Sequence, residues 1–161
     1  MADKSNFTAE EWATLLKAPA MAGLAVVAAD PSGPFSAIKE SFATGKALAE
    51  VKMQGGANAL IDAIVQDLTT PEGREMAKPS GMLGSSLEEA QTNALSVCRS
   101  AAEIVTAKAP DEAAAFKQWL LSISRRVAEA SKEGGFLGFG GTLVSEQEQA
   151  ALQAISGALG L

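Results

Sequence analysis

Apolar residues recur every three or four positions along most of the chain, a spacing typical of amphipathic α-helices. The clearest stripe lies within residues 110–133, where the spacings alternate between three and four as in helices that pack on a neighbour. The stripe consists of Ala113, Phe116, Leu120, Ile123, Val127 and Ala130. No segment shows the strict alternation of apolar and polar residues that a half-buried strand requires. The pattern therefore predicts an all-α fold.

Helix-start signals divide this pattern into separate elements. Capping boxes, in which Ser or Thr is followed three residues later by Glu, begin at Thr8, Ser86 and Ser145. Pro19 and Pro110 suit the first turn of two further helices. The expected helices are 8–17, 19–29, one from about 35, 60–68, a short turn from 69, 86–107, 110–133 and 145–159. We therefore expect one domain over 1–161, a compact bundle of about seven or eight helices.

Two regions depart from this regular pattern. Residues 69–85 hold two prolines and three glycines among polar residues, so they predict a mobile connection inside the domain. Residues 24–40 and 126–148 share an order of helix, acidic helix end, glycine-containing loop and acidic helix start. That similarity suggests two pseudo-repeated helix–loop–helix halves.

The charge distribution argues against nucleic-acid binding. The net charge is −6, and residues 1–80 and 81–161 each contribute −3. No basic patch is available to neutralise phosphates. The N-terminal residues lack the apolar core of a secretion signal, and the longest apolar run, 18–29, is too short to span a bilayer. We therefore expect a cytoplasmic protein.

The residue types present exclude several chemistries. The chain has no histidine and one cysteine, Cys98, so histidine-based nucleophile pairs, thiolate metal clusters and an intrachain disulfide are excluded. Cys98 lies on an apolar helical stripe and is expected to be a small buried hydrophobe. These exclusions favour a non-enzymatic protein.

The most unusual segment, residues 132–148, is rich in both glycine and phenylalanine. Five glycines there give the backbone freedom, while Phe136 and Phe139 favour burial. The rings either cap this protein's own core or dock a protein partner or a membrane surface. We predict a partner-binding site at Phe136, Leu137 and Phe139, with one ring directed inward and the other outward.

Acidic residues flank both glycine-containing loops. Asp30 and Glu40 flank the first loop, and Glu133, Glu146 and Glu148 flank the second. If the loops meet, these carboxylates form an oxygen-ligand site suited to calcium, magnesium or manganese. The alternative is that the acids at helix starts only complement the helix dipole.

The two acidic helix–loop–helix units, together with the ending SEQEQAALQAISGALGL, resemble the tellurite-resistance TerB-like family. The resemblance covers about residues 19–68 and 112–161. It implies a small acidic bacterial helical domain that acts in stress-response complexes near the membrane. In that family Asp at a helix end and Glu at the next helix start are proposed to bind metal. The nearest residues here are Asp30, Glu40, Glu133, Glu146 and Glu148.

The main functional prediction is a non-enzymatic, stress-associated bacterial protein that binds a protein partner through residues 134–141. The alternative is a divalent-metal protein with an Asp/Glu site and hydrolytic activity on phosphate compounds. The sequence leaves a homodimer open.

Overall fold

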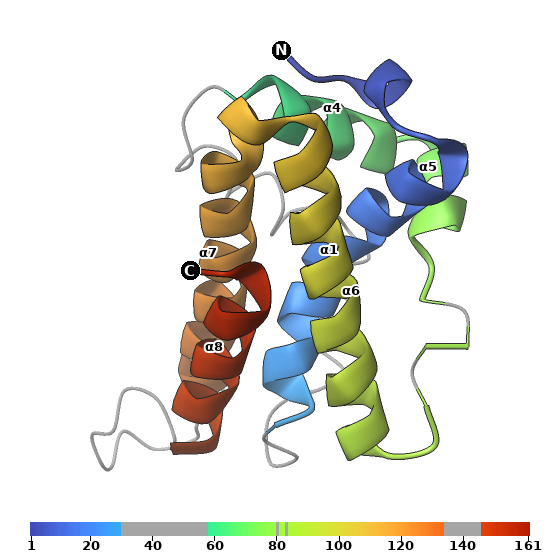
Figure 1. Ribbon diagram of the computed structural model, residues 1–161. Helices are drawn as coiled ribbons and strands as arrows, with labels where there is room; N and C mark the ends of the chain where they lie inside the picture. The colour runs from blue at the N-terminus through green and yellow to red at the C-terminus, as the bar shows by residue number, and fades with distance from the viewer. Residues whose placement is uncertain (30–57, 80, 83, 134–145) are drawn as a thin grey trace.

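The computed structural model describes residues 1–29, 58–79, 81–82, 84–133 and 146–161. Within these ranges the chain forms one 3-10 turn and six α-helices, and no strand. They are η1 (Lys4–Asn6), α1 (Ala9–Val27), α4 (Ala59–Leu68), α5 (Pro71–Ala77), α6 (Leu87–Lys108), α7 (Pro110–Glu133) and α8 (Glu146–Leu159). The helices α1, α6, α7 and α8 lie alongside one another, and α4 and α5 lie at the end where α1 begins (Figure 1). The prediction of an all-α fold is confirmed.

Two of the three predicted capping boxes lie within the described residues. The Thr8 hydroxyl accepts from Glu11 N at 3.2 Å, and Glu11 Oε2 accepts from Thr8 N at 2.7 Å. Ser86 Oγ accepts from Glu89 N at 3.1 Å, so α6 begins as the sequence predicted. The reciprocal bond differs there, because the Glu89 carboxylate accepts from Ser85 N instead. The third box begins at a residue outside the described ranges.

The helix α1 is continuous where the sequence predicted two helices. Pro19 lies inside α1, although proline has no N–H to donate to the carbonyl four residues earlier. The helix changes direction part-way along its length (Figure 1), as proline inside a helix allows. Most of α1 is buried against α6 and α7, and Ser124 Oγ of α7 donates to Ala22 O at 2.9 Å. Tertiary packing thus overrides the local signal to begin a new helix at Pro19.

The segment 71–77 forms the helix α5, where the sequence predicted a single short turn. The Thr70 hydroxyl caps it by accepting from Gly73 N at 3.0 Å, and Pro71 is its first residue. A Cβ on Gly73 would lie 2.0 Å from Asp67 O. The glycine is therefore required for the close approach of α5 to the end of α4, a role different from loop flexibility.

The six α-helices of the described residues are slightly fewer than the seven or eight predicted. The continuous α1 accounts for one helix of this difference, because it replaces two predicted helices. The helix expected from about residue 35, and both loops of the pseudo-repeat, lie outside the described residues.

The described helices share one hydrophobic core. The α7 stripe contributes Phe116, Leu120 and Ile123, which are fully buried as predicted. Trp12 and Leu15 of α1 lie in the same core, so the N-terminal helix packs at the centre of the bundle. The described parts of the chain contain no helix with the length and apolar character needed to cross a membrane.

Candidate functional site

Most of the predicted partner-binding and metal-ligating residues lie outside the described part of the chain. These are Phe136, Leu137, Phe139, Asp30 and Glu40. Glu133 is the last residue of α7, and its side chain is likewise outside the description. The proposed roles of these residues stay predictions.

The two remaining predicted ligands, Glu146 and Glu148, lie in the first turn of α8 but do not share an environment. Glu146 is exposed, whereas only 3% of Glu148 is exposed. Residues two apart on a helix point in nearly opposite directions, so the two carboxylates are separated by the helix itself. Among the residues that the structure describes, no three Asp, Glu, Cys or His side chains are placed to hold a metal ion.

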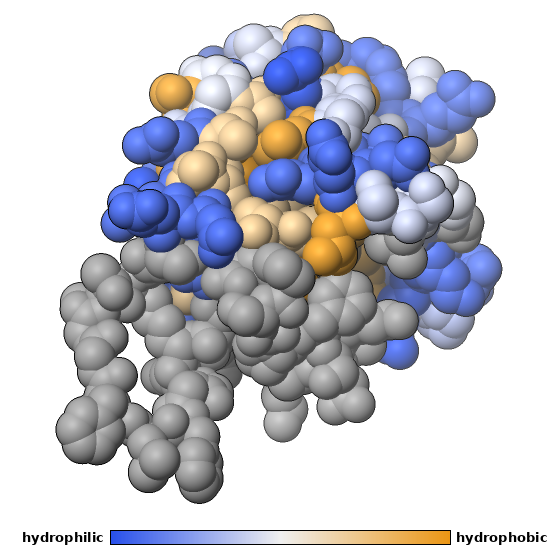
Figure 2. Space-filling view, turned by 90° about the horizontal axis from the view of Figure 1, so that it is seen from below, coloured by the Kyte–Doolittle hydropathy of each residue, from blue (hydrophilic) through white to orange (hydrophobic). Residues whose placement is uncertain are grey.

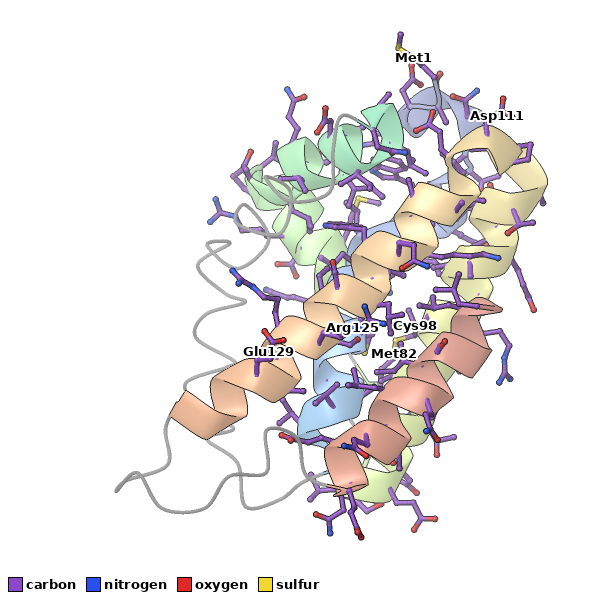
Figure 3. All side chains as sticks on the ribbon, turned by 90° about the vertical axis from the view of Figure 1, so that its left-hand side faces the viewer. Met1, Met82, Cys98, Asp111, Arg125 and Glu129 are labelled. Carbon is purple, nitrogen blue, oxygen red and sulfur yellow. The ribbon has the colours of Figure 1, made fainter. Side chains whose placement is uncertain are left out.

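Cys98 is buried between α6 and α1, as predicted (Figure 3). Its Sγ lies 4.0 Å from Ala18 O. Burial raises the pKa of the Cys98 thiol to about 12. Since the thiolate is the nucleophile and the metal ligand, this cysteine is inert at neutral pH.

The end of the bundle at which α6 and α8 begin, the lower end in Figure 1, is where residues 134–145 join α7 to α8. Leu87, the first residue of α6, is 43% exposed there. Helical periodicity predicts that Leu87 faces inward with Ala90 and Ala94, and for Leu87 that prediction is wrong. Because Leu87 stands at the first helical position, it lies ahead of the turns that pack on the core. Figure 2 looks onto this end and shows apolar residues at the surface among hydrophilic ones.

The outer face of α8 is a second surface that the sequence analysis did not single out. Its exposed residues include Ala150, Gln153, Ala154 and Gly157, and no residue from 149 to 161 is charged. The sequence does indicate this surface, because the polar residues of the last predicted helix after position 148 are glutamine and serine, which carry no charge. We call the exposed positions of this helix from 149 to 157 the α8 outer face.

The opposite end of the molecule is held by carboxylates that each join separate segments. Asp67 Oδ2 of α4 accepts from Trp12 Nε1 at 2.7 Å and from Lys4 Nζ at 3.0 Å. Glu112 of α7 accepts from Leu60 N at 2.7 Å and also from the backbone N–H of residue 2. These bonds attach the N-terminal segment and both ends of α4 to the bundle, so the cluster is structural.

The pKa of Asp67 reflects a balance of opposing effects. Burial raises it, but the hydrogen bonds, chiefly those from Trp12 and Lys4, and the charge of Lys4 together hold the pKa of the carboxyl below its ordinary value. Asp67 is therefore ionised at neutral pH, and its charge strengthens the bond from the indole N–H.

Comparisons of the chain with family models, with curated proteins and with solved structures found no match.

Proposed function

We propose that the protein is a non-enzymatic helical interaction protein whose partner binds at the lower end of the bundle. The proposed site combines Leu87 with Phe136, Leu137 and Phe139 of the glycine-rich segment. The observation that carries the proposal is the exposure of Leu87 at the end where that segment is attached.

Leu87 is unusual among the described residues. Three large hydrophobic side chains are exposed in the described part of the chain, and Leu87 is one of them. The other two, Met1 and Leu161, are the first and last residues of the sequence. Covering the exposed part of a leucine contributes roughly 1 kcal/mol to binding. Leu87 alone would therefore support only weak binding, and an aromatic anchor beside it would supply the larger share.

The helices on either side of the segment fix its attachment. The helix α7 ends at Glu133 and α8 begins at Glu146, and these two helices pack against each other and against α1. The last residue of α7 and the first residue of α8, which precede and follow the stretch 134–145, thus lie at the lower end of a packed bundle. A binding segment between two packed helices in general loses less conformational entropy when a partner binds than a free chain end does.

The test compares single variants of a tagged chain in capture of proteins from the lysate of the cell that produces it. Leu87→Ser should reduce the amount of captured partner roughly fivefold, because its exposed part contributes roughly 1 kcal/mol to binding. It should keep its melting temperature, because the side chain is already exposed. Leu161→Ser is the matched control, since Leu161 is 47% exposed at the other end of α8. If the two leucine variants capture the same proteins in equal amounts, the lower end is not the binding site.

The phenylalanines are tested in the same assay. If Phe136 and Phe139 differ in role, the alanine variant of the inward ring should lose about 3–5 kcal/mol of stability. The alanine variant of the outward ring should keep its stability and lose the partner. The cytoplasmic location and the stress-associated bacterial role implied by the TerB-like resemblance rest on the sequence alone.

A further inference from the structure

The α8 outer face differs from the solvent-facing sides of the neighbouring helices. The exposed positions of α6 include Glu88, Arg99, Glu103 and Lys108, and those of α7 include Asp111, Arg125 and Glu129. Figure 3 shows Arg125 and Glu129 projecting from α7. By contrast, α8 has no charged residue after Glu148. Depletion of charge on an exposed surface is characteristic of the centre of a protein–protein interface.

The shape of this face suits another helix. The exposed residues Ala150, Ala154 and Gly157 follow one another at spacings of four and three, so they form one stripe along α8. A Cβ built on Gly157 would meet no atom within 4 Å, so the space above the helix is open at that point. A second helix can therefore approach α8 at the short interaxial distances that small side chains permit.

The charges at the two ends of α8 indicate which molecule supplies the second helix. Glu146 is exposed in the first turn, and Lys117 Nζ of α7 lies 3.7 Å from the position of a Cβ on Gly160, beside the last turn. Two copies of α8 laid antiparallel would place Glu146 of each copy next to Lys117 of the other. The same arrangement also opposes the helix dipoles favourably.

The net charge of the protein restricts where two copies can meet. At −6 overall, two copies repel each other over most of their surfaces. The α8 outer face is an uncharged surface on which this repulsion is weakest. We propose that two copies of this chain associate through their α8 outer faces, antiparallel and about a two-fold axis. This pairing does not use Leu87, so it is independent of the proposed partner site.

The length of the helix sets the expected affinity. Fourteen residues form a helix roughly 20 Å long, and one pair of such helices buries less than the roughly 1,200 Å² of a standard stable interface. The dimer is therefore a transient one, and association should appear at roughly 0.1–1 mM chain, the range expected of weak complexes.

The first experiment is sedimentation equilibrium of the full chain from about 10 µM to 1 mM. The wild-type chain should pass from monomer to dimer over this range. Gly157→Arg should remain monomeric and folded, because its side chain enters open space on the α8 outer face. Ala114→Arg adds the same charge at an exposed position of α7 and should dimerise like the wild type. A wild-type chain that stays monomeric at 1 mM, or a Gly157→Arg chain that dimerises normally, overturns the proposal.

The second experiment tests the orientation by charge reversal. Glu146→Lys and Lys117→Glu should each weaken dimerisation roughly fivefold, since the symmetric dimer contains two such surface pairs. The double variant re-forms both pairs with reversed signs and has the wild-type net charge, so it should recover wild-type association. A parallel dimer would place like residues together and would show no recovery. Failure of the double variant to associate more tightly than either single variant therefore overturns the antiparallel arrangement.

Discussion

The two tryptophans allow the hydrogen bond between Trp12 and Asp67 to be measured against an internal control. Trp12 is 1% exposed and Trp119 is 2% exposed. Each has one phenylalanine neighbour, with ring centroids 5.8 Å apart for Phe7 and Trp12 and 6.0 Å apart for Phe116 and Trp119. They differ in one respect. The Trp12 indole N–H donates to a carboxylate, whereas the buried Trp119 N–H has no hydrogen-bond partner among the described residues.

Replacing each tryptophan with phenylalanine separates packing from hydrogen bonding. Both changes remove part of a buried ring, and each should cost a similar amount of packing energy, about 1–3 kcal/mol. Trp12→Phe also removes a hydrogen bond to a charged group, which contributes about 1.5–3 kcal/mol. Trp119→Phe instead removes an unpartnered buried donor, which relieves about 1–3 kcal/mol of desolvation cost. Trp12→Phe should therefore be more destabilising by at least about 2 kcal/mol.

The measurement is urea unfolding followed by circular dichroism at 222 nm, because the variants differ in tryptophan fluorescence. Equal m-values would show that the comparison concerns stability alone. A double-mutant cycle with Asp67→Asn then isolates the Trp12–Asp67 coupling from the packing change. Equal destabilisation by the two tryptophan variants would refute this assignment of energies, as would a coupling below about 0.5 kcal/mol.

Four further outcomes follow from the described geometry and the sequence. Gly73→Ala should destabilise the protein by about 2 kcal/mol or more in the same urea assay, because its Cβ would meet Asp67 O, whereas Gly157→Ala should stabilise α8 by up to about 1 kcal/mol. Because the folded pKa of Asp67 is lowered, the stability contributed by its charge is present above the unfolded pKa near 3.8 and is lost as the pH falls below that value. Urea melts at pH 7 and pH 3 should therefore show a smaller loss of unfolding free energy for Asp67→Asn than for the wild type. Cys98 should react with a thiol reagent at pH 8 only as fast as the native protein opens, so labelling should accelerate steeply in urea. If the acidic loops bind an ion, millimolar calcium, magnesium or manganese should raise the melting temperature, and an unchanged temperature would remove the metal alternative.

The sequence predicted the larger elements because their signals are local and repeated. The α7 stripe predicted a correct helix, and the capping boxes at Thr8 and Ser86 predicted correct helix starts. The errors occurred where non-local packing decides the outcome. Pro19 signals a helix start, yet the surrounding core keeps α1 continuous, and Gly73 signals a turn, yet it allows two helices to touch.

The candidate sites were harder to predict for a different reason. Which carboxylate meets which donor depends on contacts between residues far apart in sequence. Asp67 and Glu112 gave no sequence signal because Trp12 is 55 residues from Asp67 and Leu60 is 52 residues from Glu112. Leu87 was misplaced because helical periodicity gives its direction around the helix but not how far the core extends along it.

The central position of α1 has a consequence for how the chain folds during synthesis. This helix is made first, but the residues that cover it come much later: Ala18 O meets Cys98, 80 residues on, and Ala22 O meets Ser124, 102 residues on. At translation rates of about 5–20 residues per second, roughly 5–20 s pass between the synthesis of α1 and the synthesis of the α7 residues that cover it. During that interval its apolar residues need protection by a chaperone or by transient collapse. Slowing translation should therefore increase aggregation of this protein.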